Sequence, residues 1–138
     1  MMPAGKESLG PILLVEDDPD QIFFLRRALG KLNVAHPLHV ATNGEQAVLY
    51  LSQKDHPRPS LLLLDLKVPR IGGLRVLEWV RHQPGLRDLP AVVVTTSIEP
   101  EDRRRADQLG VVAYICKPVD AEGLREVMDL PAVHLELN

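Results

Sequence analysis

Residues 60–69 of the 138-residue chain read SLLLLDLKVP, and this stretch decides the fold class. The four leucines Leu61–Leu64 do not alternate with polar residues, which is typical of a strand buried on both faces. Such strands occur in parallel sheets that helices cover on both sides. Asp65 follows directly, so we expect its carboxylate to leave the buried strand at a rigidly held point.

Short apolar runs of the same kind recur along the chain, and each is followed by an amphipathic segment. In the first of these segments, apolar residues lie three or four positions apart from Ile22 to Leu32, which predicts a helix. Asp18 and Pro19 precede it as an N-cap and a first helical residue. The other expected strands are Ile12–Val15, Leu38–Ala41, Ala91–Val94 and Val111–Ile115. The other expected helices lie around residues 47–51, 74–80, 101–109 and 121–130.

Five strands that alternate with five helices predict a doubly wound (βα)5 domain of the α/β class, with a flavodoxin-like five-stranded parallel sheet and helices on both faces. The length suits one domain. We expect it to span residues 10–130, between a flexible N-terminus, 1–9, and a C-terminal arm, 131–138. Ligands of such sheets bind beyond the carboxyl ends of the strands.

Polar side chains follow four of the expected strands. Glu16 and Asp17 come after the first strand and Asp65 after the third, while Thr95 and Lys117 follow the fourth and fifth. Three carboxylates that share one edge repel one another unless a cation offsets them. Oxygen ligands of this kind suit Mg²⁺. A lysine and a hydroxyl beside them suit a phosphoryl group on a carboxylate.

At four short motifs the chain resembles the receiver domain of two-component response regulators. The motifs are LLVEDD at 13–18, LDLKVP at 64–69, VT at 94–95 and KP at 117–118. The resemblance covers about residues 10–130. It implies that Asp65 accepts a phosphoryl group from a phosphohistidine on a sensor histidine kinase, and that the protein is not a turnover enzyme.

The resemblance also implies roles for the surrounding residues. Glu16 and Asp17 would bind Mg²⁺ together with Asp65 and the backbone carbonyl of Lys67. No other cofactor is expected.

The remaining implied roles concern the phosphoryl oxygens and the response to phosphorylation. Thr95 and Lys117 would contact the oxygens, and Thr95 and Tyr114 would form the switch that moves on activation. A cis bond is expected between Lys117 and Pro118.

Two other functions agree less well with these residues. A flavin mononucleotide binder needs a phosphate loop after the first strand, where Glu16 and Asp17 would repel the phosphate. A haloacid dehalogenase-type phosphatase carries its nucleophile after the first strand, whereas Asp65 follows the third. A degenerate receiver that binds partners without phosphorylation stays open as the alternative.

Composition and the C-terminal residues bear on location and partners. The net charge of −3 and the lack of a long apolar run argue against nucleic-acid and membrane partners. The single cysteine, Cys116, is expected to be buried and fits a cytoplasmic protein. Few residues follow 130, so we expect a single-domain regulator, similar in its motifs and tail to those paired with phytochrome-type kinases. Val133, Leu135 and Leu137 alternate with polar residues, so the arm is expected to help form a homodimer or to pack on its own domain.

Overall fold

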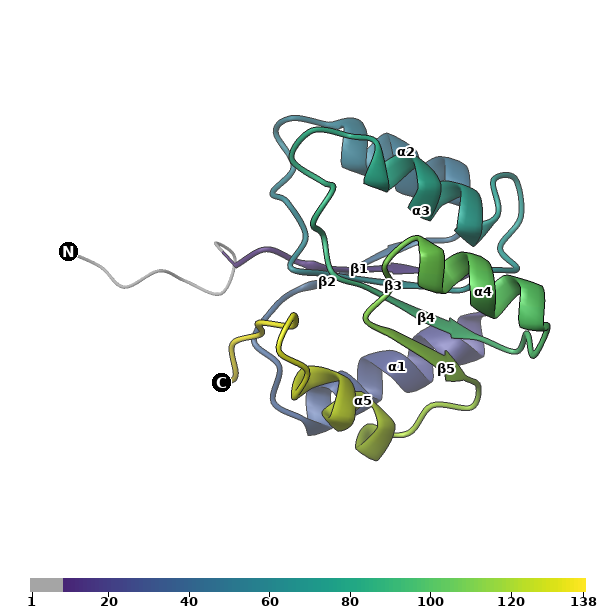
Figure 1. Cartoon of the computed structure of the whole chain (residues 1–138). Coiled ribbons are helices and arrows are strands. Elements are labelled where there is room, and N and C mark those ends of the chain that lie inside the picture. The colour runs from purple at the N-terminus through teal and green to yellow at the C-terminus, as the bar shows by residue number, and fades with distance from the viewer. Residues whose placement is uncertain (1–8) are drawn as a thin grey trace.

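The computed structural model describes residues 9–138 and contains a five-stranded parallel sheet with the order β2-β1-β3-β4-β5 (Figure 1). The flexible segment expected at 1–9 falls, except for Leu9, outside the described residues. The elements are β1 (Ile12–Val15), α1 (Pro19–Lys31), β2 (Leu38–Ala41), α2 (Gly44–Ser52), β3 (Leu61–Leu64), α3 (Gly73–Arg81), β4 (Ala91–Thr95), α4 (Pro100–Gln108), β5 (Ala113–Cys116) and α5 (Ala121–Met128). The predicted fold class is confirmed.

Helices cover both faces of the sheet, with α1 and α5 on one side and α2, α3 and α4 on the other (Figure 1). The leucine strand β3 shows why its sequence does not alternate. Leu61 and Leu63 contribute to the core under α1 and α5, while Leu62 and Leu64 contribute to the core on the opposite face. Among the described residues, no helix has the length and apolar character needed to cross a bilayer.

The strand order places β1 and β3 side by side at the centre of the sheet. Val15 pairs with Leu64 in parallel register, and the Asp65 amide donates to the Val15 carbonyl at 3.0 Å. The chain leaves β1 toward β2 on one side, whereas the chain that leaves β3 continues toward β4 on the other. Such a switch point is where doubly wound folds bind ligands, and the residues after β1 and β3 lie there.

The last strand differs from its predicted bounds, because β5 spans Ala113–Cys116 rather than Val111–Ile115. The Val111 amide donates to the Ala106 carbonyl of α4 at 3.3 Å, so Val111 belongs to the helix–strand connection. The expectation that Cys116 is buried is wrong. β5 is an edge strand, and Cys116 lies at its end, where the sheet is open to solvent.

The C-terminal arm packs on its own domain. Val34 and Leu137 form an antiparallel bridge, and the Ala35 amide donates to the Glu136 carbonyl at 2.9 Å. Val133 is buried, whereas Leu137 remains 57% exposed. The arm therefore contacts its own domain and leaves part of its apolar face to solvent. Its role in a homodimer stays a prediction.

Candidate functional site

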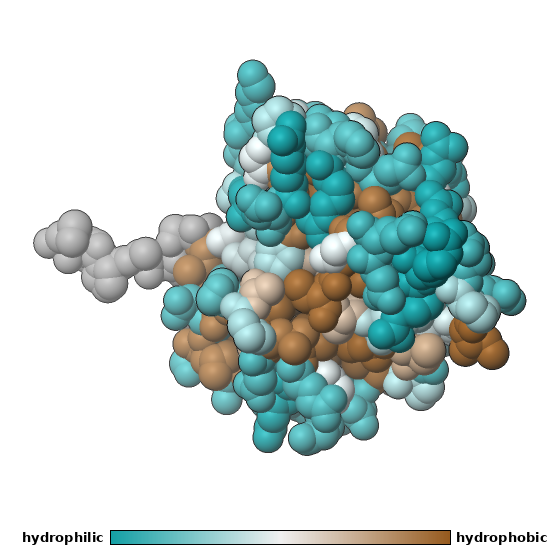
Figure 2. Space-filling view, viewed as in Figure 1, coloured by the Kyte–Doolittle hydropathy of each residue, from teal (hydrophilic) through white to brown (hydrophobic). Residues whose placement is uncertain are grey.

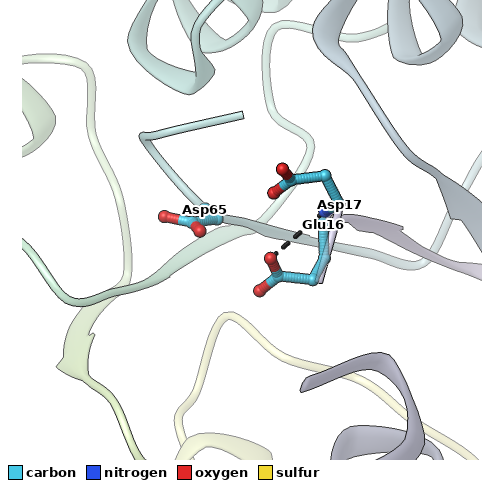
Figure 3. A group of neighbouring side chains, drawn as sticks. All are labelled: Glu16, Asp17 and Asp65. Carbon is cyan, nitrogen blue, oxygen red and sulfur yellow. Dashed lines mark hydrogen bonds between the residues drawn. The ribbon is translucent and has the colours of Figure 1, made fainter. Parts of the chain in front are cut away.

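Three carboxylates meet at the switch point of the sheet. Glu16 and Asp17 follow β1, and Asp65 follows β3 beside them (Figure 3). One oxygen from each carboxylate lies within 4.8 Å of the others. Glu16 is 1% exposed and Asp65 is 6% exposed, whereas Asp17 faces solvent. The sequence prediction that these acids share one edge is borne out by this geometry.

Lys117 brings a cation to the two buried carboxylates. Its ammonium lies 2.5 Å from Oε1 of Glu16 and 2.9 Å from Oδ2 of Asp65. The peptide bond between Lys117 and Pro118 is cis, as expected. Because burial makes an isolated carboxylate costly, the shared ammonium is what allows both acids to sit beneath the surface.

The electrostatic balance differs between the two acids. Burial raises the pKa of Glu16 above its usual value, and the Lys117 ammonium offsets this only in part. Burial also acts on Asp65, but hydrogen bonds from Lys117 and the Lys67 amide outweigh it and lower the pKa of Asp65. Burial alone would lower the pKa of Lys117, but its two carboxylate partners outweigh burial and raise that pKa. Asp65 is therefore an ionised carboxylate at neutral pH.

The backbone around Asp65 fixes the direction of its side chain. The Lys67 amide donates to Oδ1 of Asp65 at 3.1 Å. Gly73 packs so closely that a Cβ there would lie 2.3 Å from the Asp65 carbonyl oxygen. Any larger residue would have to displace the backbone of Asp65. Thr95 is fully buried at the end of β4, and a hydrogen bond from its side chain further lowers the pKa of Asp65.

The two predicted switch residues are connected through Ser97, which the sequence interpretation missed. The Ser97 amide donates to Oγ1 of Thr95 at 3.2 Å, and the Tyr114 hydroxyl donates to the Ser97 carbonyl at 3.1 Å. Ser97 is itself buried. A loop serine carries no pattern of its own, so only the position two residues after Thr95 could have pointed to it.

The carboxylate cluster has the donor chemistry of a divalent-cation site. Glu16, Asp17 and Asp65 supply hard oxygen ligands, and the exposed Asp17 leaves the site open to water molecules that Mg²⁺ retains. The three acids exceed the single Lys117 ammonium by two negative charges, which a divalent cation would neutralise. A ligand role for the Lys67 carbonyl stays a prediction.

Comparisons with known proteins agree with this geometry. The family described as the response regulator receiver domain matches residues 12–129. The chain belongs to this family. Receiver domains pair with sensor histidine kinases in two-component signalling, and the resemblance drawn from the sequence motifs is confirmed.

Two relatives of this receiver illustrate the likeness. The probable methanogenesis regulatory protein FilR2 of Methanothrix harundinacea is 33% identical over 121 residues, which cover 86% of this chain and 78% of that protein. Response regulator Rcp1 of Synechocystis is 34% identical over 110 residues, covering 77% and 75%.

Solved structures extend the comparison. The Mn²⁺-bound form of Rcp1 superposes with a TM-score of 0.81 at 30% identity, covering 92% of this chain and 99% of that one. The bacteriophytochrome response regulator AtBRR gives 0.80 at 37% identity, covering 95% and 99%. A divalent cation in one relative agrees with the carboxylate cluster of this receiver.

Replacing Asp17 tests the cation site without disturbing the buried acids. Asp17→Asn should weaken Mg²⁺ binding about tenfold or more, since loss of outer-shell partners alone costs that much in metal sites. The measurement is the melting temperature as a function of Mg²⁺ concentration. Asp18→Asn is the matched control, because the Asp18 side chain caps α1. Equal Mg²⁺ titrations for wild type and Asp17→Asn would contradict the site.

Proposed function

We propose that this receiver accepts a phosphoryl group onto Asp65 from a phosphohistidine of a sensor histidine kinase, in a Mg²⁺-dependent reaction. The observation that supports this most strongly is the Lys117 ammonium at 2.9 Å from Oδ2 of Asp65. The Lys117 ammonium lies close to the position at which negative charge would develop on the transferred phosphoryl group. The protein then acts as a phosphorylated signalling partner and not as a turnover enzyme.

The reaction follows from the chemistry of the aligned groups. A carboxylate oxygen of Asp65 forms the new P–O bond while the P–N bond to the donor imidazole breaks. The electron pair of that bond leaves with the imidazole nitrogen. Asp65 needs no base to deprotonate it, because its pKa is lowered and it is already ionised. Lys117 and Thr95 lie where they can balance the charge of the phosphoryl oxygens.

Mg²⁺ is the cation we propose for the carboxylate cluster. Glu16, Asp17 and Asp65 would hold it, and the backbone carbonyl of Lys67 would be a further ligand. A cation bound there supplies charge that offsets the repulsion between Asp65 and an incoming phosphoryl group. The residues themselves provide the orientation, since Asp65 is fixed by the backbone of Lys67 and Gly73.

A phytochrome-type sensor kinase is the donor we propose. Support comes from the relatives, because a solved form of a cyanobacterial phytochrome response regulator, RcpA, is 31% identical and AtBRR is a bacteriophytochrome response regulator. The single cysteine fits a reducing compartment, and we propose the cytoplasm as the place of transfer.

A second copy of the chain is the other partner we propose, bound through the face formed by α4, β5 and α5. Figure 2 shows a hydrophobic band between the hydrophilic surfaces of α4 and α5, over β5. Apolar residues of this segment are only partly buried, including Val112, Ile115 and Val119. Two-fold symmetric dimers are the commonest assembly among soluble homo-oligomers. The C-terminal arm would contribute the exposed side chain of Leu137 to this interface.

Labelling with small phosphodonors tests the central proposal. Phosphoramidate with Mg²⁺ should add one phosphoryl group to the wild type, seen by intact mass, and chelation of Mg²⁺ should abolish it. Asp65→Asn should remain unlabelled, whereas Asp18→Asn should label normally. A purified phytochrome-type kinase is the second donor. Equal labelling of Asp65→Asn would refute the assignment, and an unlabelled wild type would favour the degenerate receiver.

Light scattering tests the homodimer. The full-length receiver should have the mass of a dimer, and a variant that ends at Leu130 should dissociate more readily if the arm contributes through Leu137. An unchanged dimer mass after truncation would remove the arm from the interface. A monomeric full-length protein would end the dimer proposal.

A further inference from the structure

Asp102 connects α4 to two loops at the mouth of the site. It lies in the first turn of α4 and accepts a hydrogen bond from Oγ of Ser97 at 2.6 Å. Its carboxylate also forms an ion pair with the Lys67 ammonium at 3.4 Å. The hydrogen bond from Ser97, and then the charge of Lys67, hold the pKa of Asp102 below its usual value. One ionised carboxylate therefore joins the β3–α3 loop, the β4–α4 loop and α4.

Lys67 and Ser97, the two partners of Asp102, are each connected to Asp65, the proposed phosphoacceptor. Lys67 donates its backbone amide to the Asp65 carboxylate, and the Ser97 amide donates to Thr95, whose hydroxyl bonds to Asp65. The contacts thus form a closed ring that begins and ends at Asp65. A change of charge on Asp65 acts on two neighbours of Asp102 at once.

A phosphoryl group would compete with Asp102 for the Lys67 ammonium. Phosphorylation adds up to about two negative charges, and here it would add them two residues from Lys67. The Lys67 side chain is 58% exposed, whereas that of Asp102 is 20% exposed. Lysine carries its charge on a flexible four-carbon stem, so the ammonium can turn while Asp102 stays on its helix.

We propose that Lys67 is a positioning residue that holds the start of α4 through Asp102 before phosphorylation and transfers its ammonium to the phosphoryl group afterwards. This inference rests on the proposed function of Asp65. Once Lys67 leaves, Asp102 keeps its hydrogen bond from Ser97 but loses the ion pair to the β3–α3 loop, and the first turn of α4 is held less firmly. The Lys67 ammonium thereby responds to the phosphoryl group, and its departure loosens the start of α4.

Loosening of the start of α4 affects the proposed dimer face through Ser97 and Arg103. The Ser97 carbonyl accepts the Tyr114 hydroxyl, and the Arg103 guanidinium on α4 lies 5.1 Å from the centre of the Tyr114 ring. Movement of Ser97 or of the start of α4 therefore changes the surroundings of Tyr114 on β5. Lys67 connects chemistry at Asp65 to that surface.

Hydrogen–deuterium exchange of residues 97–108 tests the tether, by which we mean the ion pair of Lys67 with Asp102. Beryllofluoride with Mg²⁺ serves as the phosphoryl mimic, and fluorine NMR measures its binding to each variant. In unmodified Lys67→Gln, exchange should be about two- to fivefold faster than in the wild type, the range for loss of one exposed ion pair. Beryllofluoride should accelerate exchange in the wild type and leave Lys67→Gln unchanged. Lys67→Arg should keep the wild-type response.

Arg70→Gln is the matched control, because Arg70 belongs to the same loop but pairs with Glu45 of α2. It should show wild-type exchange in both states. Equal exchange in unmodified wild type and Lys67→Gln overturns the tether, and so does a Lys67→Gln variant that still responds to bound beryllofluoride. A wild type that binds no beryllofluoride overturns the proposed function instead, while the unmodified proteins still test the tether.

Discussion

The ammonium of Lys117, shared between Glu16 and Asp65, is the interaction on which the site depends. The side chains of these three residues are 7%, 2% and 8% exposed. Two carboxylates removed from water at the adjacent ends of β1 and β3 would repel each other and shift toward protonation. Lys117, which follows β5, outweighs this shift for Asp65 and offsets it in part for Glu16. It can reach both acids because the strands are parallel and their carboxyl ends meet at one edge.

This arrangement also explains why the site is prepared for further charge. Asp17 stands outside the buried ion pair and leaves the cluster with an excess of negative charge, which suits a divalent cation. Asp65 is held as an ionised carboxylate by Lys117 and the Lys67 amide. Glu16 and Asp65 are buried whereas Asp17 is exposed, so the cluster opens to solvent on the side of Asp17.

The sequence predicted the elements and groups whose identity depends on local pattern. Leu61–Leu64 signalled a strand buried on both faces, and the acids after β1 and β3 followed from the parallel topology and from the family motifs. Contacts between segments that are distant in the sequence could not be predicted from local pattern. Ser97 and Asp102 gain their roles only when α4 folds against the β3–α3 loop. Cys116 is exposed because β5 lies at an edge, and the strand order decides that.

The structure of the receiver crystallised with Mg²⁺ and beryllofluoride tests the central claim most directly. The account predicts a metal ion that contacts Glu16, Asp17 and Asp65, with beryllofluoride on an Asp65 oxygen. It also predicts that the Lys117 ammonium leaves Glu16 for a fluorine atom, because the metal then compensates the charge of Glu16. A metal bound elsewhere, or a Lys117 that keeps both of its present partners while Asp65 is modified, would contradict the account.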